Sequence, residues 1–157
     1  MQKVSTCLWF DNQAEEAATF YVSLFPNSRI VDIKYYLEGS PRPAGSVLTV
    51  QFTLDGGEYM ALNGGPHFKF SPAISLIANY DTQEEVDTLW RNLSEGGQEG
   101  QCGWLTDKYG VSWQIVPRAL LKLINTADNA ASQCAFSAMM KMTKLDIAAL
   151  QRAYEDA

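Results

Sequence analysis

The spacing of apolar residues changes early in the chain from the period of a strand to the period of a helix. Residues 3–10, KVSTCLWF, are rich in β-branched and aromatic side chains and predict a strand. Apolar side chains then recur at i, i+3, i+4 and i+7, which predicts a helix with one face packed on a sheet. These side chains are Ala17, Phe20, Tyr21 and Leu24. Asn12 is the expected N-cap of this helix, with Glu15 as its capping-box partner.

Three extended runs follow this helix. They are expected at residues 29–37, 46–54 and 58–62. A segment rich in glycine and proline separates the first two runs, and Asp55-Gly56-Gly57 is a hairpin-turn signal between the second and third. The first part of the chain therefore predicts the order β-α-β-β-β.

The same order begins again after a linker at residues 63–71. Residues 73–80 predict a strand, and Thr82 with Glu85 predicts a capping box at the start of a second amphipathic helix. Gly96-Gly97 suits the end of that helix, and a short extended piece follows at residues 98–101. A shift of 69 positions aligns the strand and helix of the two parts without a gap, which indicates an internal repeat.

Residues 102–117, CGWLTDKYGVSWQIVP, predict the hairpin that completes the second β-α-β-β-β unit. Asp107 and Gly110 occupy the first and fourth positions of the expected tight turn. Successive side chains of a strand point to opposite faces, so Gln114 and Trp113 are expected on opposite sides of the sheet. If Gln114 faces a cavity, Trp113 packs under a helix, and Trp104 is free to form a wall.

The composition changes after Pro117. Residues 118–124 predict a short helix, Asp128 is a candidate cap for a second helix reaching about Met142, and Thr143 with Asp146 can start a third. Met139, Met140 and Met142 make this segment rich in methionine, which suits adaptable contacts.

Charge and residue counts exclude several classes of function. The 157-residue chain has a net charge of −6, which argues against nucleic acid or an anionic membrane surface as a partner. Three cysteines at wide spacing suit reduced thiols and a cytoplasmic location. With His67 as the single histidine, a multi-histidine metal site cannot be built.

Four phrases of the sequence resemble one known family. They are CLWFDNQAEEAATFYVSLFPNS, LNGGPHFKFSPAISL, TQEEVDTLW and CGWLTDKYGVSWQIVP. Together they are similar to the PhnB-like branch of the vicinal oxygen chelate superfamily, which includes glyoxalase I, extradiol dioxygenases and bleomycin-resistance proteins. This branch often carries the label 3-demethylubiquinone-9 3-methyltransferase.

The resemblance implies an α+β fold. Two tandem β-α-β-β-β modules, residues 1–66 and 67–117, would form a curved eight-stranded mixed sheet around a cavity, and residues 118–157 would add a helical extension to one structural domain. The resemblance also implies a homodimer.

Metal enzymes of the superfamily bind a divalent ion through histidine or glutamate at four inner strand positions. These positions correspond to Thr6 (or Ser5, if the alignment is off by one), Ser75, Gln114 and a position near residues 61–63. Hydroxyls and an amide are poor ligands for a transition metal without a carboxylate or imidazole beside them. We therefore predict no metal. We also predict no S-adenosylmethionine site, because no glycine-rich turn leads from a strand into a helix.

The same neutral positions predict a small-molecule cavity. Its expected lining is Thr6, Trp9, Asn63, Phe70, Ser75, Trp104 and Gln114. Such a lining suits a neutral, partly aromatic ligand. Three functions follow: a ligand-binding protein, an enzyme acting on a quinone-like or methylated aromatic, or an interaction module that uses the methionine-rich helices. The enzyme would need a titratable group facing the cavity, and the candidates are Cys102, Asp107 and His67, each of which also has a plain structural reading.

Overall fold

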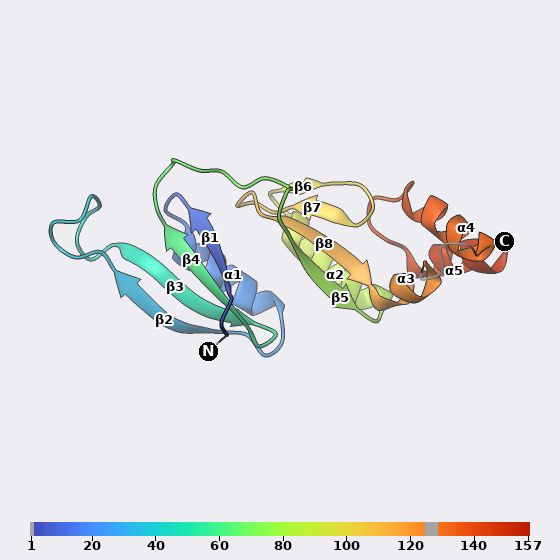
Figure 1. Cartoon of the computed structure of the whole chain (residues 1–157), viewed down its shortest axis with the longest axis horizontal. Helices are drawn as coiled ribbons and strands as arrows, with labels where there is room; N and C mark the ends of the chain where they lie inside the picture. Colours follow the sequence, from blue (N-terminus) through green and yellow to red (C-terminus); the bar gives the residue numbers. More distant parts are fainter. Residues whose placement is uncertain (1, 125–128) are drawn as a thin grey trace. The chain divides into compact units, whose positions relative to one another are not determined.

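The computed structural model describes residues 2–124 and 129–157. The chain forms two compact units, Met1–Phe70 and Ser71–Ala157, and each contains one four-stranded sheet (Figure 1). The predicted α+β class and the two successive β-α-β-β-β modules are confirmed. Within the described residues, the eight strands lie in two four-stranded sheets.

The first module follows the predicted element order. Its elements are β1 (Thr6–Phe10), α1 (Ala14–Leu24), β2 (Arg29–Tyr35), β3 (Val47–Leu54) and β4 (Gly57–Asn63). The strands lie in the order β1-β4-β3-β2, with β1 parallel to β4 and the other neighbours antiparallel. Asp55 and Gly56 both have positive φ, 48° and 80°, as a two-residue type I′ hairpin turn requires. The hairpin predicted there is confirmed.

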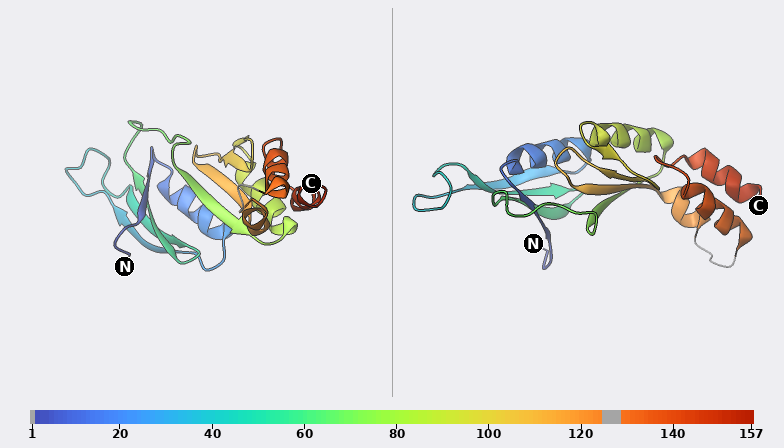
Figure 2. Two further views of the ribbon diagram at one scale, coloured as in Figure 1. Left: turned by 45° about the vertical axis from the view of Figure 1, so that its right-hand side comes forward. Right: turned by 90° about the horizontal axis from the view of Figure 1, so that it is seen from above.

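Helix α1 covers one face of this sheet, as the view from above shows (Figure 2). Alternate strand residues are buried beneath it, because side chains in a strand alternate between faces. The buried strand residues are Leu8, Phe10, Val50, Phe52, Leu54 and Ala61. Tyr21 of α1 is fully buried and contacts Phe52 at 6.5 Å between ring centroids. The core of the first unit therefore lies between α1 and the sheet.

The second module repeats this architecture. Its elements are β5 (Ser75–Tyr80), α2 (Gln83–Ser94), β6 (Gln98–Glu99), β7 (Trp104–Thr106) and β8 (Ser112–Pro117), in the sheet order β5-β8-β7-β6. The capping box predicted at Thr82 and Glu85 is present, with both reciprocal hydrogen bonds at 3.2 Å. Beyond the end of α2, Gly96 has φ +76°, the left-handed conformation expected of a helix-terminating glycine.

The internal repeat is real, but its strands are offset by one residue from the predicted alignment. A shift of 69 places Ala14 on Gln83, and these residues begin the two helices. The same shift would place buried Leu8 on Ile77, which is 57% exposed, whereas the neighbouring Ala78 is buried. The strands therefore correspond at a shift of 70. The cause is the connection from strand to helix, which spans residues 11–13 in the first module and residues 81–82 in the second.

This correction changes which residue matches Ser75. At a shift of 70 its counterpart is Ser5, the alternative considered in the sequence, and Thr6 corresponds to Leu76. Thr6 shares a sheet face with buried Leu8, on the side of α1. The prediction that Thr6 occupies the position equivalent to Ser75 is wrong.

The start of α1 also differs from the prediction. The N-cap is Gln13, which makes no side-chain capping bond, so the prediction of Asn12 as the cap is wrong. The acceptor instead comes from β4, where Asn63 Oδ1 lies 2.8 Å from the Ala14 amide that donates to it. A tertiary contact thus replaces the local cap.

The C-terminal segment of residues 118–157, called the tail below, contains α3 (Arg118–Leu123), α4 (Ala130–Met139) and α5 (Ile147–Glu155). Leu120, Leu145 and Leu150 form its buried cluster. The predicted cap Asp128 lies outside the described residues, and Asn129 provides the capping oxygen of α4. For α5 the cap is Asp146, one of the two residues expected there, and not Thr143. No helix in the described part of the chain is long and apolar enough to cross a membrane.

Candidate ligand-binding groove

The face of the second sheet that α2 does not cover carries three of the predicted site residues. Gln114 is the register partner of Ile77 on β5 and of Trp104 on β7, so these three side chains lie on one face. Ser75 lies on the same face two residues before Ile77, and its Oγ accepts a hydrogen bond of 3.0 Å from Gln114 Nε2. The amide and the hydroxyl predicted to share a site are therefore in direct contact.

The opposite face holds Trp113, as strand alternation predicted. Trp113 is 2% exposed, and its Nε1 donates to Asp107 Oδ2 at 2.9 Å. The other oxygen of Asp107 accepts from the amides of Tyr109 and Val111 at 2.9 and 3.0 Å. The buried carboxylate thus holds the hairpin turn together and does not line the groove described next.

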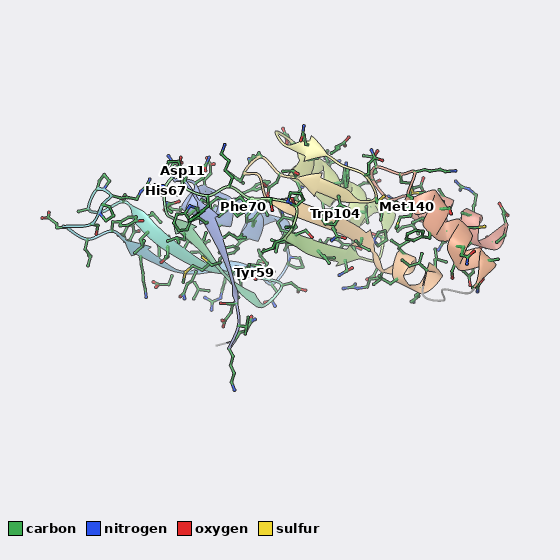
Figure 3. All side chains as sticks on the ribbon, turned by 45° about the horizontal axis from the view of Figure 1, so that its top comes forward. Asp11, Tyr59, His67, Phe70, Trp104 and Met140 are labelled. Atoms are coloured by element: carbon green, nitrogen blue, oxygen red, sulfur yellow. The ribbon has the colours of Figure 1, made fainter. Side chains whose placement is uncertain are left out.

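A groove with a volume of about 610 Å³ lies over the uncovered face. One side of the groove, called the sheet wall, comes from β5, β7, β8 and the segment before β7. The other side, called the tail wall, comes from the tail. Trp104 on β7 and Met140 at the end of α4 are labelled in Figure 3. The described lining residues are Ile77, Asn79, Gln101, Cys102, Trp104, Gln114, Val116, Leu120, Leu121, Ile124, Met139 and Met140. No residue in this set carries a formal charge at neutral pH.

Cys102 is the catalytic candidate that reaches this groove. Its Sγ lies 3.7 Å from Met140 Sδ, and a thioether is not a base that could activate a thiol. His67 is exposed in the connection after β4 (Figure 3), within the first unit. Among the predicted catalytic candidates, Cys102 is the one that lines the groove of the second unit.

The predicted first-module residues make contacts within their own module. Trp9 donates from Nε1 to the Gly65 carbonyl at 3.0 Å, and Phe68 packs edge-on against its ring at 4.9 Å between centroids. Phe70 packs in the same way against Phe10 at 5.2 Å. Trp9 and Thr6 lie on opposite faces of β1, because they are three residues apart in a strand.

Asn63 forms hydrogen bonds within the fold through both its side chain and its backbone. Besides accepting from Ala14, its amide donates from Nδ2 to the Val47 carbonyl at 3.1 Å, and its backbone carbonyl accepts from Tyr36 Oη at 2.5 Å. The side chain is 6% exposed. These bonds connect β4 to α1 and to β3, so Asn63 has a complete structural role.

The first module has a smaller hollow on its own uncovered face. Its volume is about 210 Å³, and its lining includes Ser5, Gln51, Glu58, Tyr59 and Met60. Burial raises the pKa of Tyr59 above its ordinary value. Unlike the groove of the second unit, this hollow is lined by charged residues, Glu58 and Arg29.

The donor set does not fit the metal site of the superfamily. Strand pairing matches Thr6 with Tyr59 and Leu76 with Trp113, so the counterpart of Gln114 is Met60, one residue before the predicted range. The four inner positions thus carry Ser5, Met60, Ser75 and Gln114. Two hydroxyls, a thioether and an amide lack the anionic or imidazole ligands that borderline divalent ions prefer. Across the described residues, no three His, Cys, Asp or Glu side chains gather into a metal-binding group.

The strand-to-helix connections do not fit S-adenosylmethionine bound in a doubly wound fold. Such a site needs glycines between a parallel strand and its helix, so that the backbone approaches the cofactor. Residues 11–13 and 81–82 contain no glycine, and both sheets are mixed. Neither connection can therefore cradle the cofactor in the way that a doubly wound fold does.

Sequence reasoning missed one wall of the groove. The tail residues Leu121, Ile124, Met139 and Met140 line it, but they lie on or directly after α3 and α4, and the docking position of these helices leaves no local pattern in the sequence. The first-strand position was misplaced because residues 7–10 are all apolar, so the sequence shows no alternation there, and only the structure reveals that Leu8 and Phe10 are buried while Cys7 is exposed.

Comparison with known proteins places this chain in a family. Residues 2–116 match the family described as 3-demethylubiquinone-9 3-methyltransferase. A solved structure of a putative 3-demethylubiquinone-9 3-methyltransferase, PhnB protein, from Bacillus cereus is 41% identical, with a TM-score of 0.69 over 74% of this chain and 99% of that chain. No curated protein matched the sequence.

Two more distant structures share the fold. Protein PA1353 from Pseudomonas aeruginosa is 20% identical with a TM-score of 0.62, over 74% of this chain and 98% of that chain. The fosfomycin resistance protein FosX from Listeria monocytogenes, solved with Mn(II) and sulfate, is 14% identical with a TM-score of 0.50, over 73% of this chain and 92% of that chain. The chain thus belongs to the PhnB-like family labelled 3-demethylubiquinone-9 3-methyltransferase.

Proposed function

We propose that this protein binds a neutral, partly aromatic small molecule in the groove of its second unit. The observation that carries the proposal is the absence of charge among the described lining residues, beside a polar pair formed by Gln114 and Ser75. Burying a charged group without a partner costs several kcal/mol, so this lining disfavours ions. A neutral ligand does not carry this free-energy cost when it is buried.

Two lining groups give the ligand its contacts. Trp104 offers an aromatic surface on which a ring can stack. Gln114 donates one amide hydrogen to Ser75 and retains a carbonyl oxygen and a second N–H, which can bond to a ligand hydroxyl or carbonyl. The volume of about 610 Å³ lies within the range of about 300–1,000 Å³ typical of small-molecule sites.

The exposed apolar side chains at the groove support the same proposal. Ile77 is 57% exposed, and Leu121 and Met140 are each 53% exposed. Apolar side chains that gather around a concave surface mark binding sites more often than isolated ones do. A ligand that covers them gains the free energy of burying their surface.

The experiment compares two naphthalene compounds that differ in charge. The neutral fluorophore N-phenyl-1-naphthylamine reports occupancy, and 2-naphthol and 2-naphthoate compete for the site at neutral pH. We expect 2-naphthol to displace the fluorophore at a concentration at least about tenfold below that of 2-naphthoate, because the anion is desolvated without a partner. Equal competition by both compounds, or no saturable fluorescence, would contradict the proposal.

A pair of variants locates the site. Gln114→Leu keeps the size of the side chain and removes its hydrogen bonds, so the affinity for 2-naphthol should fall about fivefold, the effect of one net hydrogen bond. Gln51→Leu makes the same change on the uncovered face of the first sheet and should leave the affinity unchanged. A larger effect from Gln51→Leu would place the ligand elsewhere.

A further inference from the structure

The second wall of the groove comes from a part of the chain that the family match does not include. That match ends at residue 116, before α3 begins at Arg118. The Bacillus cereus protein is covered over 99% of its length by 74% of this chain, which leaves it almost no residues that could correspond to the tail. The tail wall is therefore a feature that this chain adds to the shared modules.

The tail is fixed to the second module by backbone hydrogen bonds. The amides of Cys102 and Gly103 donate to the carbonyls of Met142 and Thr143, each at 2.8 Å. Leu145 is fully buried against Gly103, where an added Cβ would lie 3.0 Å from Leu145 Cδ1. Gly103 also has φ +84°, so both its conformation and the close approach of Leu145 require glycine.

Side chains of α2 hold the same part of the tail. Gln83 donates from Nε2 to the Leu145 carbonyl at 3.0 Å and accepts from the Ile147 amide at 2.8 Å. Lys144 forms an ion pair of 2.7 Å with Asp87. These contacts fix residues 142–147, which directly follow the groove residues Met139 and Met140, to the second module.

The two walls of the groove differ in chemistry. The sheet side offers an indole and amide groups, through Trp104, Gln114 and Asn79, together with the aliphatic side chains of Ile77 and Val116, whereas the described lining residues of the tail are all apolar. The tail side offers aliphatic and thioether side chains, with Leu121 and Met140 about half exposed. A ligand that satisfies both walls needs a polar-edged ring for the sheet and an aliphatic group for the tail. Methionine adapts its shape to such a group at low cost.

We infer that the tail wall is the specificity-determining element of this protein, and that it selects neutral aromatic ligands that carry an aliphatic chain. This inference rests on the proposed function, because it names the class of ligand for the same groove. The sheet wall binds the ring, and Leu121 and Met140 of the tail bind the chain.

The test uses the full chain and a series of 4-alkylphenols from methyl to hexyl, with affinities measured by displacement of N-phenyl-1-naphthylamine. Each added CH₂ that becomes buried should raise the affinity by up to about fourfold. The increase should stop when the chain is longer than the tail wall. Affinities that stay constant from methyl to hexyl would overturn the inference.

Matched variants assign the chain-length effect to the tail. Leu121→Gln and Met140→Gln replace exposed apolar groove residues with polar ones of similar size, so the fold is expected to persist. Each should reduce the gain per CH₂ to below about twofold, so that the affinity for 4-hexylphenol falls much more than the affinity for 4-methylphenol. Phe136→Gln is the control, because Phe136 is an exposed apolar tail residue, 48% exposed, that is not part of the groove lining.

The outcomes separate the two proposals. If the phenols bind with affinities independent of chain length, or if Phe136→Gln acts like the groove variants, the inference about the tail is wrong while the groove remains a ligand site. If no phenol displaces the fluorophore and 2-naphthol also fails to compete, the proposed function itself is wrong. An unchanged gain per CH₂ in both groove variants would also overturn the inference.

Discussion

Replacing Asn63 with alanine should destabilise the first unit much more than replacing Asn12. Asn63 accepts from the Ala14 amide and donates to the Val47 carbonyl, and it is 6% exposed. Asn12 is exposed and does not cap α1. The sequence alone favours Asn12 as the cap, so the two variants test the tertiary cap against the local one.

The magnitude follows from the groups that lose their partners. Loss of the hydrogen bond from Asn63 Nδ2 to the Val47 carbonyl costs about 1 kcal/mol. The Ala14 amide belongs to a residue that is 0% exposed, and an unsatisfied buried donor costs about 1–3 kcal/mol. We therefore expect Asn63→Ala to lower the free energy of unfolding by about 2–4 kcal/mol, and Asn12→Ala by less than about 0.5 kcal/mol.

Urea denaturation followed by circular dichroism measures both losses, and hydrogen exchange at the Ala14 amide reports the cap itself. Asn63→Ala should speed exchange at that amide, whereas Asn12→Ala should leave the exchange rate unchanged. The reasoning is refuted if Asn12→Ala costs more than Asn63→Ala, or if exchange at Ala14 is the same in both variants.

Four further outcomes are expected. Asp107→Asn should lower the free energy of unfolding by about 1.5–3 kcal/mol in urea melts, because the buried carboxylate that accepts hydrogen bonds from three donors is lost. The variant should still bind 2-naphthol, and an unchanged melt would contradict this prediction. Hydrogen bonds from Lys144 and Gln83 lower the pKa of Asp87 below its ordinary value of 3.8, so the Lys144–Asp87 pair stabilises the fold above that pH and loses its effect as the pH falls through the lowered pKa. Because both side chains are about 40% exposed, Lys144→Met should cost less than about 1 kcal/mol at pH 7 and a smaller amount at pH 2, and an equal cost at both pH values would rule the pairing out. Gly64→Ala should displace Trp9, since the new Cβ would lie 2.2 Å from the indole, and cost about 1–3 kcal/mol; a native tryptophan emission spectrum and an unchanged melt would contradict it. The resemblance to the superfamily predicts a homodimer, which a monomeric mass in sedimentation at micromolar concentration would exclude.

The fold could be predicted from the sequence wherever local patterns decide the structure. The apolar face of α2, its capping box at Thr82 and the Asp55-Gly56 turn each depend on residues within a few positions, and each is present. The alternation of side chains along a strand also correctly predicted that Gln114 and Trp113 lie on opposite faces of the sheet. These features follow from helix and strand periodicity alone.

The sequence did not predict the features that depend on contacts between distant residues. The cap of α1 comes from Asn63, 49 positions beyond Ala14, and no local pattern marks that pairing. The single extra residue between β1 and α1 shifted the strand alignment and exchanged Ser5 for Thr6. The tail wall was missed for the same reason, because only the packed structure brings Leu121 and Met140 to the sheet residue Trp104.

The four tryptophans allow a direct test of the claim that the groove is a ligand site. Trp9, Trp90 and Trp113 donate from their indole Nε1 to Gly65, Glu99 and Asp107, whereas Trp104 lines the groove. In a ¹H–¹⁵N spectrum of the indole groups, titration with 2-naphthol should move the Trp104 resonance saturably and leave the other three in place. A titration that moves Trp9 or Trp113 and leaves Trp104 unmoved would contradict the account.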